Sequence, residues 1–151
     1  MNYNVVDLVI FSIANFLNLV LAVMFIARAR GLKPLERRAG IATLVLILPV
    51  GAAMIINLVN GREWWYVVFP ALLLAFFLVE LALDYILELD FRNTRLLWPY
   101  LLLYYLSMMA MIGYSFGIGE IFGFITLATY FISLGATWYS YSRVGHGHSE
   151  A

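Results

Sequence analysis

Five long apolar runs constrain the fold of this sequence more than any other feature. They cover residues 5–27, 39–60, 65–88, 96–114 and 120–141. A transmembrane helix needs about 20 predominantly apolar residues, and each run is close to that length. The runs take up most of the 151 residues, so only short loops and tails remain. The sequence therefore predicts an all-α integral membrane protein, with residues 1–151 forming a single domain of five transmembrane helices in one compact bundle.

The segments between the runs carry a strongly uneven distribution of basic residues. We expect cytoplasmic loops at 28–38 and 89–95 and a polar tail at 142–151. Five helices place these three segments on one side of the membrane. The three segments hold eight of the nine Lys and Arg residues. Because Lys and Arg concentrate in cytoplasmic loops, the N-terminus is predicted to lie outside and the C-terminus in the cytoplasm. The expected location is the cytoplasmic (inner) membrane of a prokaryote.

The rest of the composition argues against several classes of function. Nine basic and nine acidic residues give a net charge of zero, so there is no basic surface for a nucleic-acid partner. The chain has no cysteine, and its two histidines lie in the last six residues, so the usual ligands of haem and iron–sulfur clusters are missing. We expect no cofactor and leave a metal open. The expected partners are membrane lipids and either further copies in a homo-oligomer or a larger membrane complex.

The third run carries three carboxylates, Glu80, Asp84 and Glu88, at a spacing of four residues. This spacing puts them on one helical face. If Glu88 marks the inner edge of the membrane, a rise of 1.5 Å per residue puts Asp84 about 6 Å and Glu80 about 12 Å deep. Acids inside a bilayer are costly and usually functional. Glu80 is therefore predicted to bind a proton or cation, with the other two on its path to the cytoplasm. A protonated Glu80 that joins helices by a hydrogen bond is the alternative.

Each of the other helices offers a polar atom at a depth similar to that of Glu80. In the second run, Pro49 has no N–H to donate to the carbonyl of Val45, which is left free as an acceptor. If the faces that carry these groups converge, they form a polar ring around Glu80. The side chains predicted to bind a ligand or ion with Glu80 and Asp84 are Asn15, Asn18, Tyr104, Tyr105 and Ser133.

A second set of polar residues lies at the predicted outer side. These residues are able to line an outer vestibule, but solvation at the surface is the simpler interpretation. They are Asp7, Asn57, Asn60, Glu63 and Glu120.

These patterns favour a small transporter or channel-like protein that is coupled to protons or cations through Glu80. The alternatives are an accessory or anchor subunit of a larger complex and a membrane sensor that binds a lipophilic ligand. Five helices and this length resemble the tryptophan-rich sensory proteins, which bind porphyrins and sterols, although the first loop here has no tryptophan.

An enzyme is the less favoured interpretation. The spacing Glu80-x3-Asp84-x3-Glu88 is similar to half of the acidic motif of intramembrane prenyltransferases. That resemblance implies a Mg²⁺-diphosphate site, but the chain has no second acidic motif.

Overall fold

Helices make up nearly all of the chain. The computed structural model describes residues 4–89 and 94–148, and within those ranges it contains helices and no strand. The five segments that are long and apolar enough to span a membrane comprise α1 (Val5–Ala29), α2 (Lys33–Val45) with α3 (Ile47–Val59), α4 (Trp65–Glu80) with the π-helix η1 (Leu81–Ile86), α5 (Leu97–Ile118) and α6 (Glu120–His148). The predicted all-α architecture with five such helices is confirmed.

The first predicted loop, residues 28–38, is mostly helical in the structure. Helix α1 continues to Ala29 and α2 already begins at Lys33, so the connection is three residues long. Pro34 lies in the first turn of α2, where a missing N–H costs little because the first helical N–H groups have no partner within the helix. The proline therefore begins a helix here instead of marking a loop.

The last two predicted boundaries also differ from the structure. Helix α5 continues to Ile118, and α6 continues to His148, so the expected tail at 142–151 is helical for most of its length. Residues 90–93 of the expected loop at 89–95, and residues 149–151, lie outside the described part of the chain. The apolar pattern locates each helix core well, but polar residues continue a helix as readily as they end it.

The second span is interrupted at Leu46, between α2 and α3. Pro49 is the cause, because it cannot donate to the carbonyl of Val45 and its ring crowds that carbonyl. The Leu46 N–H turns back to the Thr43 carbonyl at 3.1 Å instead. The predicted effect of Pro49 on the backbone is therefore seen as a break in the helix.

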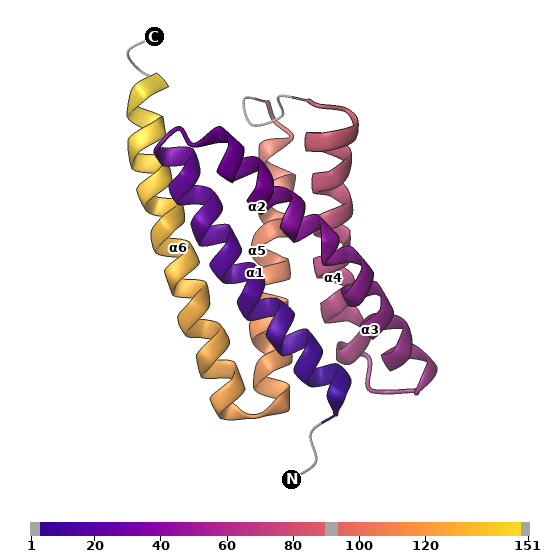
Figure 1. The fold of residues 1–151 in the computed structure, drawn as a ribbon. Helices are drawn as coiled ribbons and strands as arrows, with labels where there is room; N and C mark the ends of the chain where they lie inside the picture. Colours follow the sequence, from indigo (N-terminus) through magenta and orange to yellow (C-terminus); the bar gives the residue numbers. More distant parts are fainter. Residues whose placement is uncertain (1–3, 90–93, 149–151) are drawn as a thin grey trace.

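Helix α1 is the centre of the bundle. It packs against α6, α2, α3 and α5, while α4 lies between α3 and α5. Figure 1 shows α2 and α3 crossing the bundle obliquely, with α2 beside the upper end of α1 and α3 beside the lower part of α4. Helix α1 begins and helix α6 ends at opposite ends of the bundle, as an odd number of spans requires.

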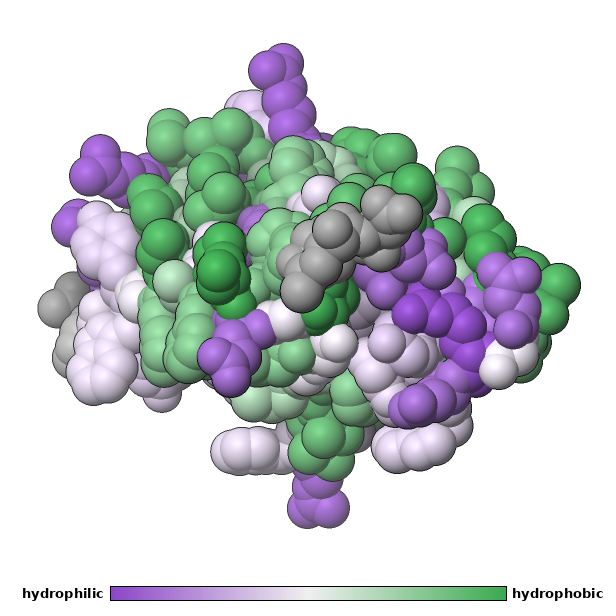
Figure 2. Space-filling model, turned by 90° about the horizontal axis from the view of Figure 1, so that it is seen from below, coloured by the Kyte–Doolittle hydropathy of each residue, from purple (hydrophilic) through white to green (hydrophobic). Residues whose placement is uncertain are grey.

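An apolar layer fills the middle of the bundle. Its fully buried side chains come from four of the five spans and include Leu17, Leu21, Val50, Leu73, Phe76, Phe77, Met108 and Met111. The outside is apolar as well: many large aliphatic and aromatic side chains are exposed around the bundle. Figure 2 looks onto the lower end and shows hydrophobic residues along much of the rim, with hydrophilic residues concentrated toward one side. An apolar exterior of this kind suits a hydrocarbon environment.

Gly117 allows close packing between α5 and α4. A Cβ atom at this position would overlap the indole ring of Trp65. That ring is stacked on Tyr66 with centroids 3.6 Å apart, so it cannot move alone. We expect Gly117→Ala to destabilise the bundle by about 1–3 kcal/mol, the usual range for overpacking.

Gly135→Ala is the matched control for this prediction, because a Cβ there meets nothing within 4 Å and Ala is the better helix former by about 0.5–1 kcal/mol. The unfolding midpoint of the purified protein in detergent measures both effects. Equal midpoints for the two variants would contradict the packing that we describe.

Candidate functional site

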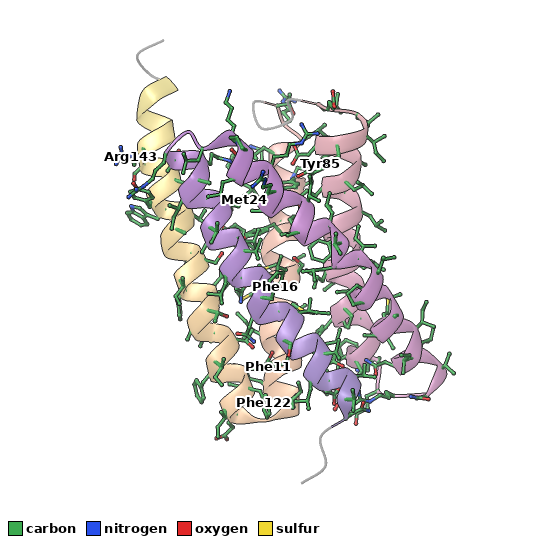
Figure 3. All side chains as sticks on the ribbon, in the orientation of Figure 1. Phe11, Phe16, Met24, Tyr85, Phe122 and Arg143 are labelled. Carbon is green, nitrogen blue, oxygen red and sulfur yellow. The ribbon has the colours of Figure 1, made fainter. Side chains whose placement is uncertain are left out.

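A charged cleft opens at the upper end of the bundle, where α1, α2 and η1 meet. Its volume is about 280 Å³. Figure 3 labels Met24 on α1 and Tyr85 on η1 at this end, with α2 passing close to both. All but one of its lining residues are polar or charged, and the set is Met24, Arg28, Lys33, Glu36, Arg37, Glu80, Asp84, Tyr85 and Glu88.

The carboxylates of the cleft lie at graded depths. Glu80 is buried, with 4% of its surface exposed, whereas Asp84 is half-buried and Glu88 is exposed. The face that the four-residue spacing predicts is therefore a real feature of the structure, because all three residues line one cleft. Glu80 forms its most buried carboxylate, and the other two lie between it and the mouth.

The backbone of this segment departs from an ordinary α-helix. After Glu80 the chain continues as the π-helix η1. This form is rare in proteins, and where it occurs it is often found at a functional site. The turn ends at Glu88, which has a φ of 50°, and the Leu89 N–H bonds to the Leu83 carbonyl at 2.9 Å. A positive φ is uncommon for a residue with a side chain. The acidic face of the cleft is thus carried by irregular backbone.

Tyr85 bridges the width of the cleft. Its hydroxyl lies so close to Gly40 of α2 that a Cβ atom at Gly40 would overlap it. Tyr85 is also within electrostatic range of Glu80 and Asp84 on its own side and of Arg37 on α2. Glycine at position 40 therefore sets how closely α2 approaches the acidic segment.

Of the other predicted site residues, Tyr104 interacts electrostatically with Glu80. It is buried, its ring packs on Phe76 with centroids 5.3 Å apart, and it is within electrostatic range of Glu80. Ser133 is buried beside Tyr104, and the half-buried Tyr105 has its ring 5.0 Å from that of Tyr104. Tyr105 and Ser133 thus lie beside Tyr104, and none of the three residues lines the cleft.

Asn15 and Asn18 are not part of a ring around Glu80. Both face α6: Asn15 Nδ2 donates to Thr126 Oγ1 at 3.1 Å, and Asn18 Nδ2 donates to Thr129 Oγ1 at 2.9 Å. Thr129 in turn donates to Asn15 Oδ1 at 2.7 Å. Counting residues along a helix does not give the direction in which these side chains point. Hydrogen bonds of this kind join helices inside an apolar bundle.

At the lower end of the bundle a buried polar cluster closes the structure. Arg62, between α3 and α4, makes a two-pronged pair with the Asp7 carboxylate of α1, Nη2 to Oδ2 being 3.0 Å. The Tyr114 hydroxyl of α5 donates to Asp7 at 2.7 Å. Arg62 also lies over the ring of Tyr66, 3.4 Å from its centroid. The hydrogen bond to Asp7 raises the pKa of Arg62 above its ordinary value, so the guanidinium stays charged at any ordinary pH.

Asn57 completes this cluster because of a proline in the neighbouring helix. Pro70, inside α4, has no N–H for the Tyr66 carbonyl four residues earlier. Asn57 Nδ2 donates to that carbonyl at 3.0 Å and to the Tyr114 hydroxyl at 3.1 Å, while its Oδ1 accepts from Arg62 at 3.1 Å. The cluster therefore links α1, α3, α4 and α5 through groups that satisfy one another.

This cluster corrects the simpler interpretation of the outer polar residues. Asp7 and Asn57 are buried, with 6% and 0% of their surface exposed, and are not solvated surface groups. Asn60, Glu63 and Glu120 are exposed, as expected. The sequence does not single out Tyr114, but it does hold a signal for Arg62. This residue is the only Lys or Arg on its side of the predicted membrane, and Asp7 is an acid in the first turn of the first helix.

The described carboxylates of the cleft are not arranged as a metal centre. Across residues 4–89 and 94–148, no group of three or more His, Cys, Asp or Glu side chains is arranged to hold a metal ion. The resemblance of the Glu80 spacing to half of a prenyltransferase motif thus gains no support from the geometry.

No family model, no curated protein and no solved structure matches this chain. The functional conclusion therefore depends on the residues and geometry of the molecule itself.

The contacts of the buried cluster predict losses of stability of different size for two substitutions. Asp7→Asn removes the charge partner of Arg62, whose side chain is only 18% exposed, and should cost about 3 kcal/mol, as the loss of one member of a buried pair does. Tyr114→Phe leaves a donor of Asn57 unsatisfied and should cost about 1–3 kcal/mol. Unfolding midpoints in detergent measure both costs.

Glu63→Gln is the control for these two variants. Glu63 is exposed and accepts a hydrogen bond from Trp65 at 2.8 Å, so its loss should change stability by less than about 0.5 kcal/mol. If Asp7→Asn were no more harmful than Glu63→Gln, the cluster would not hold the lower end of the bundle together.

Proposed function

We propose that this chain is an integral membrane protein that acts as a proton- or cation-coupled transporter, with Glu80 as the group that loads and releases the coupling ion. The observation that carries the proposal is the asymmetry between the two ends of the bundle. A polar cleft leads from one end to a buried carboxylate, whereas the other end is closed by mutually satisfied polar groups.

The proposed topology has the N-terminus outside and the cleft on the cytoplasmic side. In its support, Arg28, Lys33 and Arg37 line the cleft, and basic residues favour the cytoplasmic side. Trp98 and Trp138, near the same end, are 73% and 78% exposed, as suits aromatic residues at a membrane interface. The inner membrane of a prokaryote and a homo-oligomeric or larger assembly remain part of this proposal.

The distance between the two ends supports a working cycle with two openings. Tyr66 and Glu80 are 14 residues apart along α4 and its continuation, which corresponds to about 21 Å at 1.5 Å per residue. Fully buried apolar side chains such as Leu73, Phe76 and Phe77 fill the interval. In the state described, the cleft gives an ion a route to Glu80. Outward release would require the cluster around Asp7 and Arg62 to open.

Among the rival functions, the cleft gives no advantage to a sensor for lipophilic ligands. Its lining is charged, with Tyr85 as its single aromatic member, whereas pockets for apolar ligands are lined mainly by hydrophobic and aromatic side chains. An accessory subunit requires no cleft that leads to a buried acid. The hydrogen bonds of Asn15 and Asn18 to α6 fit a purely structural role for those two residues in either case.

Proton uptake into proteoliposomes that contain the purified protein tests the proposed role of Glu80. With an imposed potential or cation gradient, the parent protein should acidify or alkalinise the lumen, and Glu80→Gln should lower that rate by at least about tenfold, because the side chain keeps its shape but can no longer take up a proton. Glu63→Gln, at the opposite end, should transport as the parent does. A fully active Glu80→Gln variant, or a parent with no flux under any gradient, would overturn the proposal.

Single cysteines test the topology, since the parent chain has none. We expect Leu32→Cys, between α1 and α2, to react with a membrane-impermeant maleimide only from the cytoplasmic side. Asn60→Cys, at the end of α3, should react only from outside; both positions are exposed. Labelling of intact cells and of inverted vesicles distinguishes the two sides. Reaction of both residues from the same side would contradict the five-span arrangement, and the reverse pattern would contradict the orientation.

A further inference from the structure

Two arginines from different helices meet at one tyrosine hydroxyl, at the upper end of the bundle. Arg143 Nη1 of α6 donates to the Tyr139 hydroxyl at 3.3 Å, and its guanidinium lies 5.5 Å from the centroid of the same ring. Arg30, at the end of α1, is within side-chain hydrogen-bonding range of that hydroxyl. Figure 3 labels Arg143 on the upper part of α6, beside the turn between α1 and α2. The two cations therefore lie close to each other.

No acid balances the charge of this arginine pair in the part of the chain that the structure describes. Neither Arg30 nor Arg143 is paired with a carboxylate there, and Glu36, in the first turn of α2, is paired with Arg28 at 2.7 Å. Like charges at close range repel each other. Both arginines are exposed, and one phenolic oxygen accepts from only a few of their N–H groups. The remaining donors suit an anion, above all a phosphate, to which arginine makes two parallel hydrogen bonds.

The arginine pair lies among aromatic residues that mark a membrane interface. Trp138 and Tyr141, one and two residues from Tyr139, are 78% and 80% exposed. Tryptophan and tyrosine concentrate at the level of the lipid headgroups, where the phosphates of a bilayer also lie. The anion that this pair is placed to meet is therefore the phosphate of a lipid.

Below the arginine pair, the surface of both helices is apolar and open. Ile26 precedes Arg30 by four residues on α1, and Gly135 precedes Tyr139 by four residues on α6, so each lies on the same helical face as the polar residue above it. Ile26 is 41% exposed, and a Cβ atom at Gly135 would meet nothing within 4 Å. Helices α1 and α6 pack against each other. Acyl chains therefore have apolar surface to follow from the arginine pair toward the middle of the bundle.

We propose that Arg30, Arg143 and Tyr139 form a binding site for an anionic phospholipid, with its phosphate between the two guanidinium groups and its acyl chains along the exposed faces of α1 and α6. A zwitterionic lipid also carries a phosphate, but its ammonium group brings a further positive charge to two arginines. Basic pockets between transmembrane helices bind anionic headgroups in this way. The inference rests on the membrane location proposed above and not on the transport of an ion.

Native mass spectrometry of the delipidated full-length protein in detergent tests the proposal. Phosphatidylglycerol and phosphatidylcholine with the same acyl chains are added in equal amounts. Because charge-assisted hydrogen bonds to phosphate are strong, we expect phosphatidylglycerol to bind at least about tenfold more tightly. Equal affinity for the two lipids would overturn the proposal. Free glycerophosphoglycerol should not displace the lipid, because it has no chains to bury; displacement would mean a site for a soluble anion and would also overturn it.

Paired substitutions test whether the preference arises at this site. Arg30→Gln combined with Arg143→Gln should lower the preference for phosphatidylglycerol to about twofold or less. The matched control is Arg38→Gln combined with Arg95→Gln, which removes the same charge from two other exposed arginines and should keep the preference of the parent. Because all four residues are exposed, the unfolding midpoints should stay close to that of the parent. An equal loss from both pairs would mean a general attraction to basic residues and would overturn the proposal.

The same preparations separate this inference from the transport function. Proton flux that depends on Glu80, in a protein without a preference for phosphatidylglycerol, would overturn the lipid site alone. A preference that depends on Arg30 and Arg143, in a protein without flux under any gradient, would overturn the transport function alone.

Discussion

The carbonyl of Tyr66 is the group on which the lower half of the structure depends. Pro70 leaves it without a helical donor, and a free carbonyl inside an apolar bundle is costly. Asn57 supplies the missing donor, and its remaining polar atoms bring in Tyr114 and Arg62. Asp7 then neutralises Arg62. One proline inside α4 thus explains why four helices meet at a buried polar cluster.

The upper end of the bundle follows a different design. There the charged residues surround a cavity instead of filling it, and the chain continues from α4 into a π-helix beside the buried Glu80. Irregular backbone is tolerated at membrane depth where it lines a cavity. The two ends therefore differ in structure: at one end polar groups join the helices, and at the other a cavity is lined by a buried carboxylate.

The sequence was sufficient for the helices but not for the directions in which their side chains point. Run length located five segments that are long and apolar enough to span a membrane. It could not show that Asn15 and Asn18 face α6, because the rotation of a helix about its axis is set by packing against its neighbours. The pair between Asp7 and Arg62 joins residues 55 positions apart, and the spacing of apolar residues does not distinguish the π-helix from an α-helix.

The central claim is that Glu80 is buried yet connected to water through the cleft. Infrared difference spectroscopy measures it directly, with the Glu80 carboxyl band identified by its loss in Glu80→Gln. The account predicts that this band changes between its protonated and ionised forms when the pH of the bulk solution is varied. A band that stays in one form at every pH at which the protein remains folded would contradict it, and Glu80 would then be a structural group within a closed bundle.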